Sequence, residues 1–375
     1  MAVEIKPVRS KQDRKAFVEF PFQIYRFDRN WVPPLNMEQY DLLNSEKHPW
    51  YEHGEAEFFL AYQDGKLVGR ISAQVDKLHV ERHDNTGFFG FYEAVDDTRV
   101  SKALFKAAEE WLRERKVDKI RGPFSLNINE YAGFLVDGWH YPPMILMTHN
   151  PPYYNDHVKR AGFGQVKDLY AWHYDILKDL PEMALPIAQK VMDYPGLVLR
   201  SFDMKNIDRE VQIMQDIFNE AWINNWGYLP LTSSEVKKMS QDLKLILDPE
   251  AAIIAEVNGD PAGICFCLPN LNEVIQDLDG KLFPTGLLKV LWRTKVKNPK
   301  TVRLVAMGVR KKYRGSVLGG LSIAMYVDIH RRTKRLGYEL GELGWTLEDN
   351  KKVNQGIEFM GGKVYKTYRV YEKSL

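Results

Sequence analysis

Cysteine is almost missing from this sequence of 375 residues, which contains only Cys265 and Cys267. A disulfide framework or a structural zinc site needs more cysteines, so neither is expected, and we expect no metal. Long apolar runs are missing too, because no stretch approaches the roughly 18 apolar residues that span a bilayer. The first residues lack the apolar core of a signal peptide. These features predict a cytoplasmic protein without a transmembrane segment.

The sequence also lacks an excess of charge of one sign. Its 52 lysines and arginines oppose 50 acidic residues, which leaves a formal charge of +2. A dedicated nucleic-acid-binding protein usually has a larger basic excess, so no nucleic-acid partner is expected. An apolar content of 45% excludes general disorder, and the length suggests two or three domains.

What the sequence does contain is an internal repeat. In the first half, the apolar segments Glu57–Tyr62 and Leu67–Val75 flank an Asp-Gly turn. In the second half, Ala252–Val257 and Ala262–Leu268 flank an Asn-Gly turn. Asp-Gly and Asn-Gly supply the positive φ angles of a tight hairpin. Two corresponding β-hairpins are therefore predicted.

The repeat continues with a long amphipathic helix in each half, predicted over Val100–Lys116 and Val317–Leu336. A strand follows each helix, over Asp118–Leu126 and Tyr338–Leu347, and a short helix and a last strand close each half. We predict a first domain over residues 1–176, a linker over 177–196 and a second domain over 197–375. Two unrelated α/β segments that share common turns are the alternative.

The second half resembles the GNAT superfamily of acyl-CoA-dependent N-acyltransferases. The resemblance depends on the strand Leu304–Val309, the basic and glycine-rich segment Arg310–Gly320, and the long helix that follows. Asn350 and the pair Gly361-Gly362 reinforce it, and the ending resembles a large, poorly characterised bacterial subgroup. The resemblance covers nearly the whole chain. It implies an α/β (α+β) fold of two tandem domains, each a mixed, mostly antiparallel sheet flanked by helices.

In that superfamily, the loop before the long helix binds the pyrophosphate of coenzyme A. Free N–H groups at a helix start and the positive end of its dipole form an anion site. The resemblance thus implies acetyl-CoA or another acyl-CoA as co-substrate. A glycine-rich connection into a buried helix is the alternative, since Val317 stands where the family has its first glycine. The implied cofactor-binding residues are Val309, Arg310, Arg314, Gly315, Ser316, Val317, Leu318, Gly319, Gly320 and Asn350.

The first half lacks this loop. Its strand Thr86–Val95 leads through Asp96 and Asp97 directly into the helix. Aspartates cap a helix start well but repel phosphate. We therefore expect the first domain to be a degenerate copy that does not bind the cofactor.

The resemblance also implies catalytic groups. The backbone N–H of Val309 is the expected donor to the thioester carbonyl. The tyrosine that often protonates the leaving thiolate is replaced by Ile357. The sequence leaves the acid open between Tyr365 or Tyr368, which are near in sequence, and water, which serves in relatives without the tyrosine. For the base we choose Glu342 over Glu339 and Glu348, because Gly341 and Gly344 leave the backbone open beside it.

The predicted reaction moves an acetyl or longer acyl group to the amine of a small molecule or peptide, by direct attack in a ternary complex. One rival is a catalytically inactive GNAT-fold binding protein. Another is an acyltransferase that takes its acyl group from acyl carrier protein, suggested by the apolar and basic insertion at 281–303. That insertion also suits a membrane surface or a long acyl chain, and an ordinary amphipathic helix is its simplest interpretation. The sequence leaves the oligomeric state open.

Overall fold

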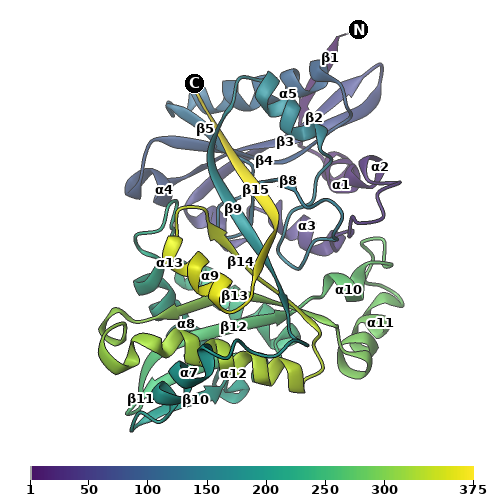
Figure 1. The fold of residues 1–375 in the computed structure, drawn as a ribbon. Helices are drawn as coiled ribbons and strands as arrows, with labels where there is room; N and C mark the ends of the chain where they lie inside the picture. Colours follow the sequence, from purple (N-terminus) through teal and green to yellow (C-terminus); the bar gives the residue numbers. More distant parts are fainter. Residues whose placement is uncertain (1) are drawn as a thin grey trace. The chain divides into compact units, whose positions relative to one another are not determined.

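The computed structural model describes residues 2–375, apart from the side chains of Lys295, Ser316 and Val317 (Figure 1). The chain divides into two compact units. The first unit contains the chain up to Leu169 together with Ile275–Leu287 and Lys366–Leu375. The second unit contains Tyr170–Val274 and Leu288–Tyr365. The last strand of the chain therefore contributes most of its residues to the first unit.

The first unit is built on a mixed sheet in the order β1-β2-β3-β4-β5-β15. All neighbours are antiparallel except β4 and β5, and β15 pairs with both β5 and β8. Its elements are β1 (Val3–Pro7), α1 (Lys11–Glu19), α2 (Pro21–Ile24), α3 (Asn36–Leu42), β2 (Gly54–Gln63), β3 (Lys66–Asp76), α4 (Lys77–Arg82), β4 (Thr86–Ala94), α5 (Thr98–Glu114), β5 (Lys119–Gly122), β6 (Phe124–Ser125), β7 (Tyr131–Ala132), β8 (Phe134–Asp137), α6 (Tyr153–Arg160) and the beginning of β9 (Gly164–Asp175).

The second unit has a sheet in the order β10-β11-β12-β13-β14, antiparallel except for the pair β13 and β14. Each unit thus has a mixed, mostly antiparallel sheet with helices, and the predicted fold class is confirmed. The elements are α7 (Ala184–Met192), β10 (Leu197–Ser201), α8 (Ile207–Trp222), α9 (Ser233–Ile246), β11 (Ala252–Val257), β12 (Asp260–Pro269), α10 (Asn272–Ile275), α11 (Gly286–Trp292), β13 (Thr301–Val309), α12 (Leu321–Arg335), β14 (Leu340–Leu347), α13 (Lys351–Phe359) and the beginning of β15 (Lys363–Ser374).

Both predicted hairpins are confirmed. Asp64 and Gly65 have φ angles of 51° and 74°, and Asn258 and Gly259 have 51° and 79°. Two successive residues with positive φ form the turn that matches the right-handed twist of the flanking strands. The turn chemistry therefore fixed the position of each hairpin.

Each sheet contains a β-bulge next to its parallel pair of strands. In the second unit Phe266 pairs with Ala306 but Cys267 pairs with Leu304, so Val305 is an extra residue on β13. A bulge bends its strand and increases the local twist. The parallel ladder with β14 ends at the same point, with the pair Leu304 and Leu343. We call the region beyond this pair, where β13 continues to Val309 and β14 to Leu347, the fork.

The long helix of the second unit begins later than predicted. Residues Ser316–Gly320 form a 3-10 turn, and α12 begins at Leu321 rather than at Val317. Its end is as predicted, because Gly337 follows with a φ of +87°. The predicted linker at 177–196 contains α7, which packs against Gly320.

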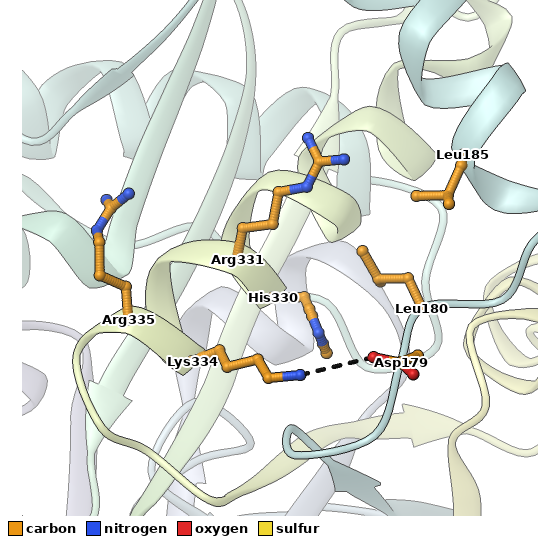
Figure 2. A pocket seen from close by; sticks show the side chains of 7 residues that line it. All are labelled: Asp179, Leu180, Leu185, His330, Arg331, Lys334 and Arg335. Atoms are coloured by element: carbon orange, nitrogen blue, oxygen red, sulfur yellow. Dashed lines mark ion pairs between the residues drawn. The ribbon is translucent and has the colours of Figure 1, made fainter.

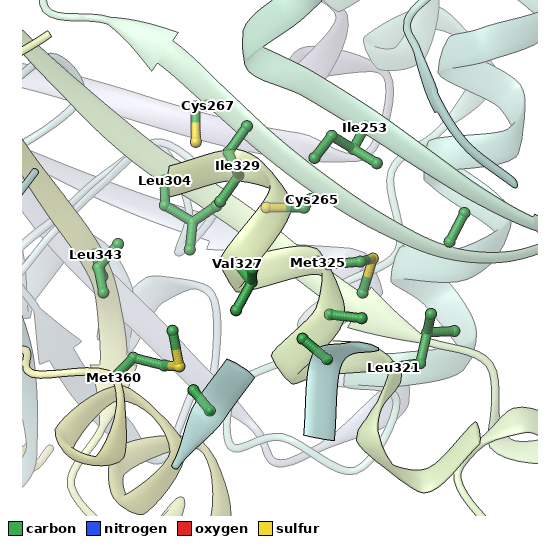
Figure 3. Close-up of a cluster of buried hydrophobic side chains, with 14 of the residues drawn as sticks. Ile253, Cys265, Cys267, Leu304, Leu321, Met325, Val327, Ile329, Leu343 and Met360 are labelled. Carbon is green, nitrogen blue, oxygen red and sulfur yellow. The ribbon is translucent and has the colours of Figure 1, made fainter. Parts of the chain in front are cut away.

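The core of the second unit lies between α12 and the sheet. Figure 3 shows side chains of β12, β13, β14 and α12 gathered there, among them Leu304, Leu343 and Met325. Cys265 and Cys267 are buried free thiols in this cluster, as expected of core residues. Among the described residues, no helix has the length and apolarity needed to cross a membrane.

Candidate active site at the fork of the second unit

The fork exposes one edge of β13. The ladder recorded between β13 and β14 runs from the pair Thr301 and Leu340 to the pair Leu304 and Leu343. Gly344, with a φ of +121°, adds a departure from strand geometry on β14 just after the last pair. The backbone of β13 from the bulge to Val309 therefore presents N–H and C=O groups to the fork rather than to a ladder with β14.

The amide of Val309 faces the fork. The N–H of Arg310 donates to the carbonyl of Ala262, on the side of β12, at 2.8 Å. Successive peptide groups of a strand point to opposite edges, so the N–H and C=O of Val309 point away from β12. The carbonyl bears this out, because it accepts a hydrogen bond from Nε of Arg314 at 2.7 Å.

In the first unit, the backbone amide that corresponds to Val309 already donates a hydrogen bond to a side chain of the chain itself. Val95 donates to the carbonyl of Val68 as Arg310 does to Ala262, which makes Ala94 the counterpart of Val309. The N–H of Ala94 donates to the hydroxyl of Tyr154 at 3.0 Å. Tyr154, on α6, is fully buried. A hydroxyl from the chain itself therefore fills the place that a ligand oxygen would take.

A buried polar cluster holds Tyr154 in that place. Its hydroxyl donates to Oε2 of Glu93 at 2.7 Å, and Tyr25 donates to the same atom at 2.9 Å. Burial raises the pKa of Glu93 and raises the pKa of Tyr154. Helices α6 and α13 end at the corresponding glycines Gly162 and Gly361. Tyr154 lies eight residues before Gly162, and the residue eight positions before Gly361 is Val353, which is 40% exposed. Among the described residues of the second unit, no side-chain hydroxyl accepts a hydrogen bond from the N–H of Val309.

The loop from β13 to α12 carries four cationic side chains and no acidic one. Two of the four are partly neutralised by acids from elsewhere in the unit, since Arg310 lies 3.8 Å from Glu220 and Lys312 forms an ion pair with Asp260. The hydrogen bond from Lys312 lowers the pKa of Asp260. The exposed side chains of Lys311 and Arg314 remain as the principal positive groups of the loop.

The three glycines of the loop have different surroundings. A Cβ atom on Gly315 would meet nothing within 4 Å, and one on Gly319 only the carbonyl of Arg314 at 3.5 Å. A Cβ atom on Gly320 would lie 2.9 Å from the side chain of Ile187 on α7. Gly320 is therefore needed for helix packing, whereas Gly315 and Gly319 leave space in which an anion can approach the backbone.

The remaining predicted cofactor residues are placed as follows. Leu318 is buried in the core and anchors the loop rather than facing a ligand. Asn350 precedes α13, and its backbone N–H donates to the carbonyl of Leu347 at the end of β14. The predicted roles of the Ser316 and Val317 side chains lie outside the described part of the structure. The structure thus brings Val309 and Arg314 into contact, whereas Arg310 turns its N–H to β12 and its side chain to Glu220.

Glu342 lies at the closed end of the fork. It is fully buried, and its ladder partner on β13 is Arg303, whose Nε lies 3.1 Å from Glu342 Oε1. Tyr365 donates a hydrogen bond to the other carboxylate oxygen. Arg303 also donates to the carbonyl of Gly344 at 2.8 Å. These contacts lock the last paired rungs of β13 and β14, where the two strands begin to diverge.

The position of Glu348 differs. It stands in the turn directly after the end of β14, whereas Glu342 lies within the paired part of that strand, at the closed end of the fork. The identity of the base stays a prediction, and variants of Glu342 and Glu348 test it in the Discussion.

One contact of the loop was missed in the sequence. Glu220, on α8, accepts a hydrogen bond from the backbone N–H of Lys311 at 2.6 Å. It therefore joins α8 to the beginning of the loop. No motif surrounds Glu220, and its separation of 91 positions from Lys311 gave no signal.

A pocket of the second unit lies away from this site, at the C-terminal end of α12 (Figure 2). It measures about 570 Å³ and is lined by His330, Arg331, Lys334 and Arg335 together with Asp179, Leu180 and Leu185. Lys334 lies 3.9 Å from Asp179, and burial lowers the pKa of His330. The loop residues do not line this pocket. We found no group of potential metal ligands among the described residues.

The sequence is similar to that of two curated proteins over almost its whole length. It is 41% identical over 376 residues to "Bacterial ceramide synthase" of Caulobacter vibrioides, covering all of this chain and 98% of that one. It is 38% identical to "Protein YghO" of Escherichia coli, covering 99% of this chain and 95% of that one. No family model matches the chain.

The fold is similar to that of solved GNAT structures. A tandem GNAT protein from the clavulanic acid biosynthesis pathway superimposes with a TM-score of 0.58 at 12% identity, covering 99% of this chain and 98% of that one. A GCN5-related N-acetyltransferase from Sphaerobacter thermophilus gives 0.51 at 14% identity, covering 84% and 80%. These identities support the shared fold alone.

Proposed function

The chain belongs to the bacterial family that includes the Caulobacter vibrioides ceramide synthase and YghO. From this premise and from the GNAT fold, we propose that it is a GNAT-type N-acyltransferase that makes a ceramide-type amide. The donor is a long-chain acyl-CoA and the acceptor is the amine of a long-chain amino alcohol. The reaction takes place in the cytoplasm, at the fork of the second unit. The observation that carries the proposal is the Val309 amide, which faces the fork at the head of an acid-free, basic loop.

The proposed chemistry needs a carbonyl that is polarised and a diphosphate that is held. The Val309 N–H donates to the thioester oxygen, which becomes an oxyanion when the amine attacks. The exposed cations Lys311 and Arg314 and the open backbone at Gly315 and Gly319 bind the diphosphate of coenzyme A. The C–N bond forms, the C–S bond breaks, and the thiolate takes a proton, which gives the amide and free coenzyme A.

The amine must lose a proton before or during attack, because an ammonium group has no lone pair. We propose Glu342 as the base, and Glu348, directly after the end of β14, is its competitor. A buried carboxylate in an ion pair with Arg303 is also well suited to hold the fork in shape. The pH profile of the Glu342 variant, described in the Discussion, distinguishes these two roles.

A direct assay tests the proposed function. The purified full-length protein is incubated with palmitoyl-CoA or acetyl-CoA and with sphinganine, and the amide is measured by mass spectrometry while free thiol is measured in parallel. We expect amide and thiol to appear in equal amounts, faster with the long acyl chain. Thiol release without amide, or no reaction with any acyl-CoA, contradicts the proposal. Turnover with palmitoyl acyl carrier protein alone would assign the donor to the rival class.

The filled amide of the first unit predicts the binding stoichiometry. Since Tyr154 occupies the N–H of Ala94 and Asp97 stands where the loop would begin, only the second unit can hold the donor. Isothermal titration of the full-length chain with a non-hydrolysable acyl-CoA analogue should give one molecule bound per chain. The variant Tyr154→Phe removes the hydroxyl and should leave this number at one. Two sites per chain would show that the first unit is a working copy.

A further inference from the structure

The segment formed by α11 and the π-helical turn Arg293–Lys297 exposes an unusual amount of apolar surface. Leu288 and Val296 are each 68% exposed, Trp292 is 50% exposed and Leu291 is 48% exposed, all within the second unit. Exposed apolar side chains usually occur singly on a protein surface. Here the four lie within nine residues, and Phe283, just before them in the chain, is 66% exposed. The cluster therefore needs a partner to cover it.

The exposed residues lie on one side of the segment. Positions 288, 291, 292 and 296 follow the spacing of a helix face. The segment is attached through other groups, because Arg293 donates from Nη1 to the carbonyl of Val274 at 2.7 Å. Thr294 donates to the carbonyl of Val290 at 2.8 Å, which satisfies the backbone within the segment. A fixed short helix thus presents an apolar side to solvent.

The sequence that contains this segment carries charge of one sign. Residues 280–327 contain no aspartate or glutamate. Lys289 lies within α11, and the ammonium group of Lys297 lies 5.0 Å from the centre of the Trp292 ring. An apolar face that includes a tryptophan and has lysines beside it is the composition of helices that lie in the interface of anionic membranes.

We propose that Leu288, Leu291, Trp292 and Val296 insert into the surface of an anionic lipid bilayer, with Lys289 and Lys297 on the headgroups. Among the exposed side chains described in this segment, apolar ones outnumber charged ones, which favours a lipid surface over an acidic protein, whose recognition depends mainly on charge. This inference goes beyond the proposed function, and it is tested by binding without turnover. Its failure and the failure of the acyl-transfer proposal can therefore be told apart.

Vesicle co-sedimentation tests the proposal with the full-length protein. Vesicles of pure phosphatidylcholine are compared with vesicles that also contain phosphatidylglycerol. We expect the protein to sediment with the anionic vesicles, and the double variant Leu288→Ser/Leu291→Ser to lose at least tenfold in partition. The double variant Lys289→Glu/Lys297→Glu should lose a similar factor. The matched control is Leu245→Ser, which removes a leucine that is 80% exposed on α9.

The outcomes separate the alternatives. Loss of binding in both segment variants but not in Leu245→Ser, with unchanged circular dichroism, supports the proposal. Equal binding of the wild-type protein and the leucine variant overturns it, as does failure of the wild-type protein to bind anionic vesicles. Binding of an acidic acyl carrier protein that depends on Lys289 and Lys297, without vesicle binding, overturns it in favour of a protein partner.

Discussion

Replacing Arg303 with alanine is expected to lower the free energy of unfolding by about 3–5 kcal/mol, the usual cost of leaving one member of a buried ion pair alone. Arg303 and Glu342 are 4% and 0% exposed and face each other on the last rungs of the parallel ladder. Without the guanidinium, the Glu342 carboxylate keeps only its hydrogen bond from Tyr365 in a site without water access. Urea unfolding followed by circular dichroism measures the difference.

The control for this prediction is an exposed ion pair of the same unit. Arg335 lies 3.6 Å from Glu250, and its side chain is 68% exposed. The variant Arg335→Ala should change the free energy of unfolding by no more than about 1 kcal/mol, because exposed pairs are screened by water. If Arg303→Ala were as mild as this control, the pair would not hold the fork.

The same pair decides the role of Glu342 in the reaction. The variant Glu342→Gln keeps the shape of the side chain and an oxygen that accepts from Tyr365. If Glu342 is the base, kcat falls by about 10²–10⁴-fold and the acidic limb of the pH profile is lost. If it only holds the fork, the acidic limb of the pH profile stays in Glu342→Gln and is lost in Glu348→Gln. Each result assigns the base to one carboxylate.

Local chemistry made much of the fold predictable. The Asp-Gly and Asn-Gly turns placed both hairpins, and Gly337 placed the end of α12, because each depends on residues adjacent in the chain. The start of α12 was predicted four residues early, since the periodicity of Leu318 and Leu321 continues through the 3-10 turn. Helical spacing alone does not distinguish these two kinds of turn.

The decisive parts of the site depend on contacts between distant residues. The bulge at Val305 is defined only by its pairing with β12. The hydrogen bond from the Ala94 N–H to Tyr154 joins residues 60 positions apart. The hydrogen bond from the Lys311 N–H to Glu220 joins residues 91 positions apart. The packing of α7 on Gly320 likewise appears only in three dimensions. The sequence could therefore predict a phosphate loop but not explain which of its glycines face open space.

The second large effect is expected from removing the Val309 N–H. Proline is the direct test, because it has no backbone donor. This N–H points to the fork and takes no part in the ladder with β12, so Val309→Pro removes no sheet hydrogen bond. Gly308, the preceding residue, already lies in the strand, the conformation that proline favours for its predecessor.

Loss of one oxyanion donor lowers kcat by about 10²–10³-fold in acyl transfer, and this is the result expected for Val309→Pro. The variant Val309→Ala keeps the N–H and should retain kcat within a few fold, which separates the amide from the side chain. Steady-state kinetics with palmitoyl-CoA, on variants whose thermal unfolding is unchanged, measures both. A folded Val309→Pro protein with nearly normal kcat would exclude this amide as the oxyanion donor. The oxyanion donor would then have to be another group at the fork. Because alternate peptide groups of a strand point to the same edge, β13 beyond the bulge offers a further N–H group on that side.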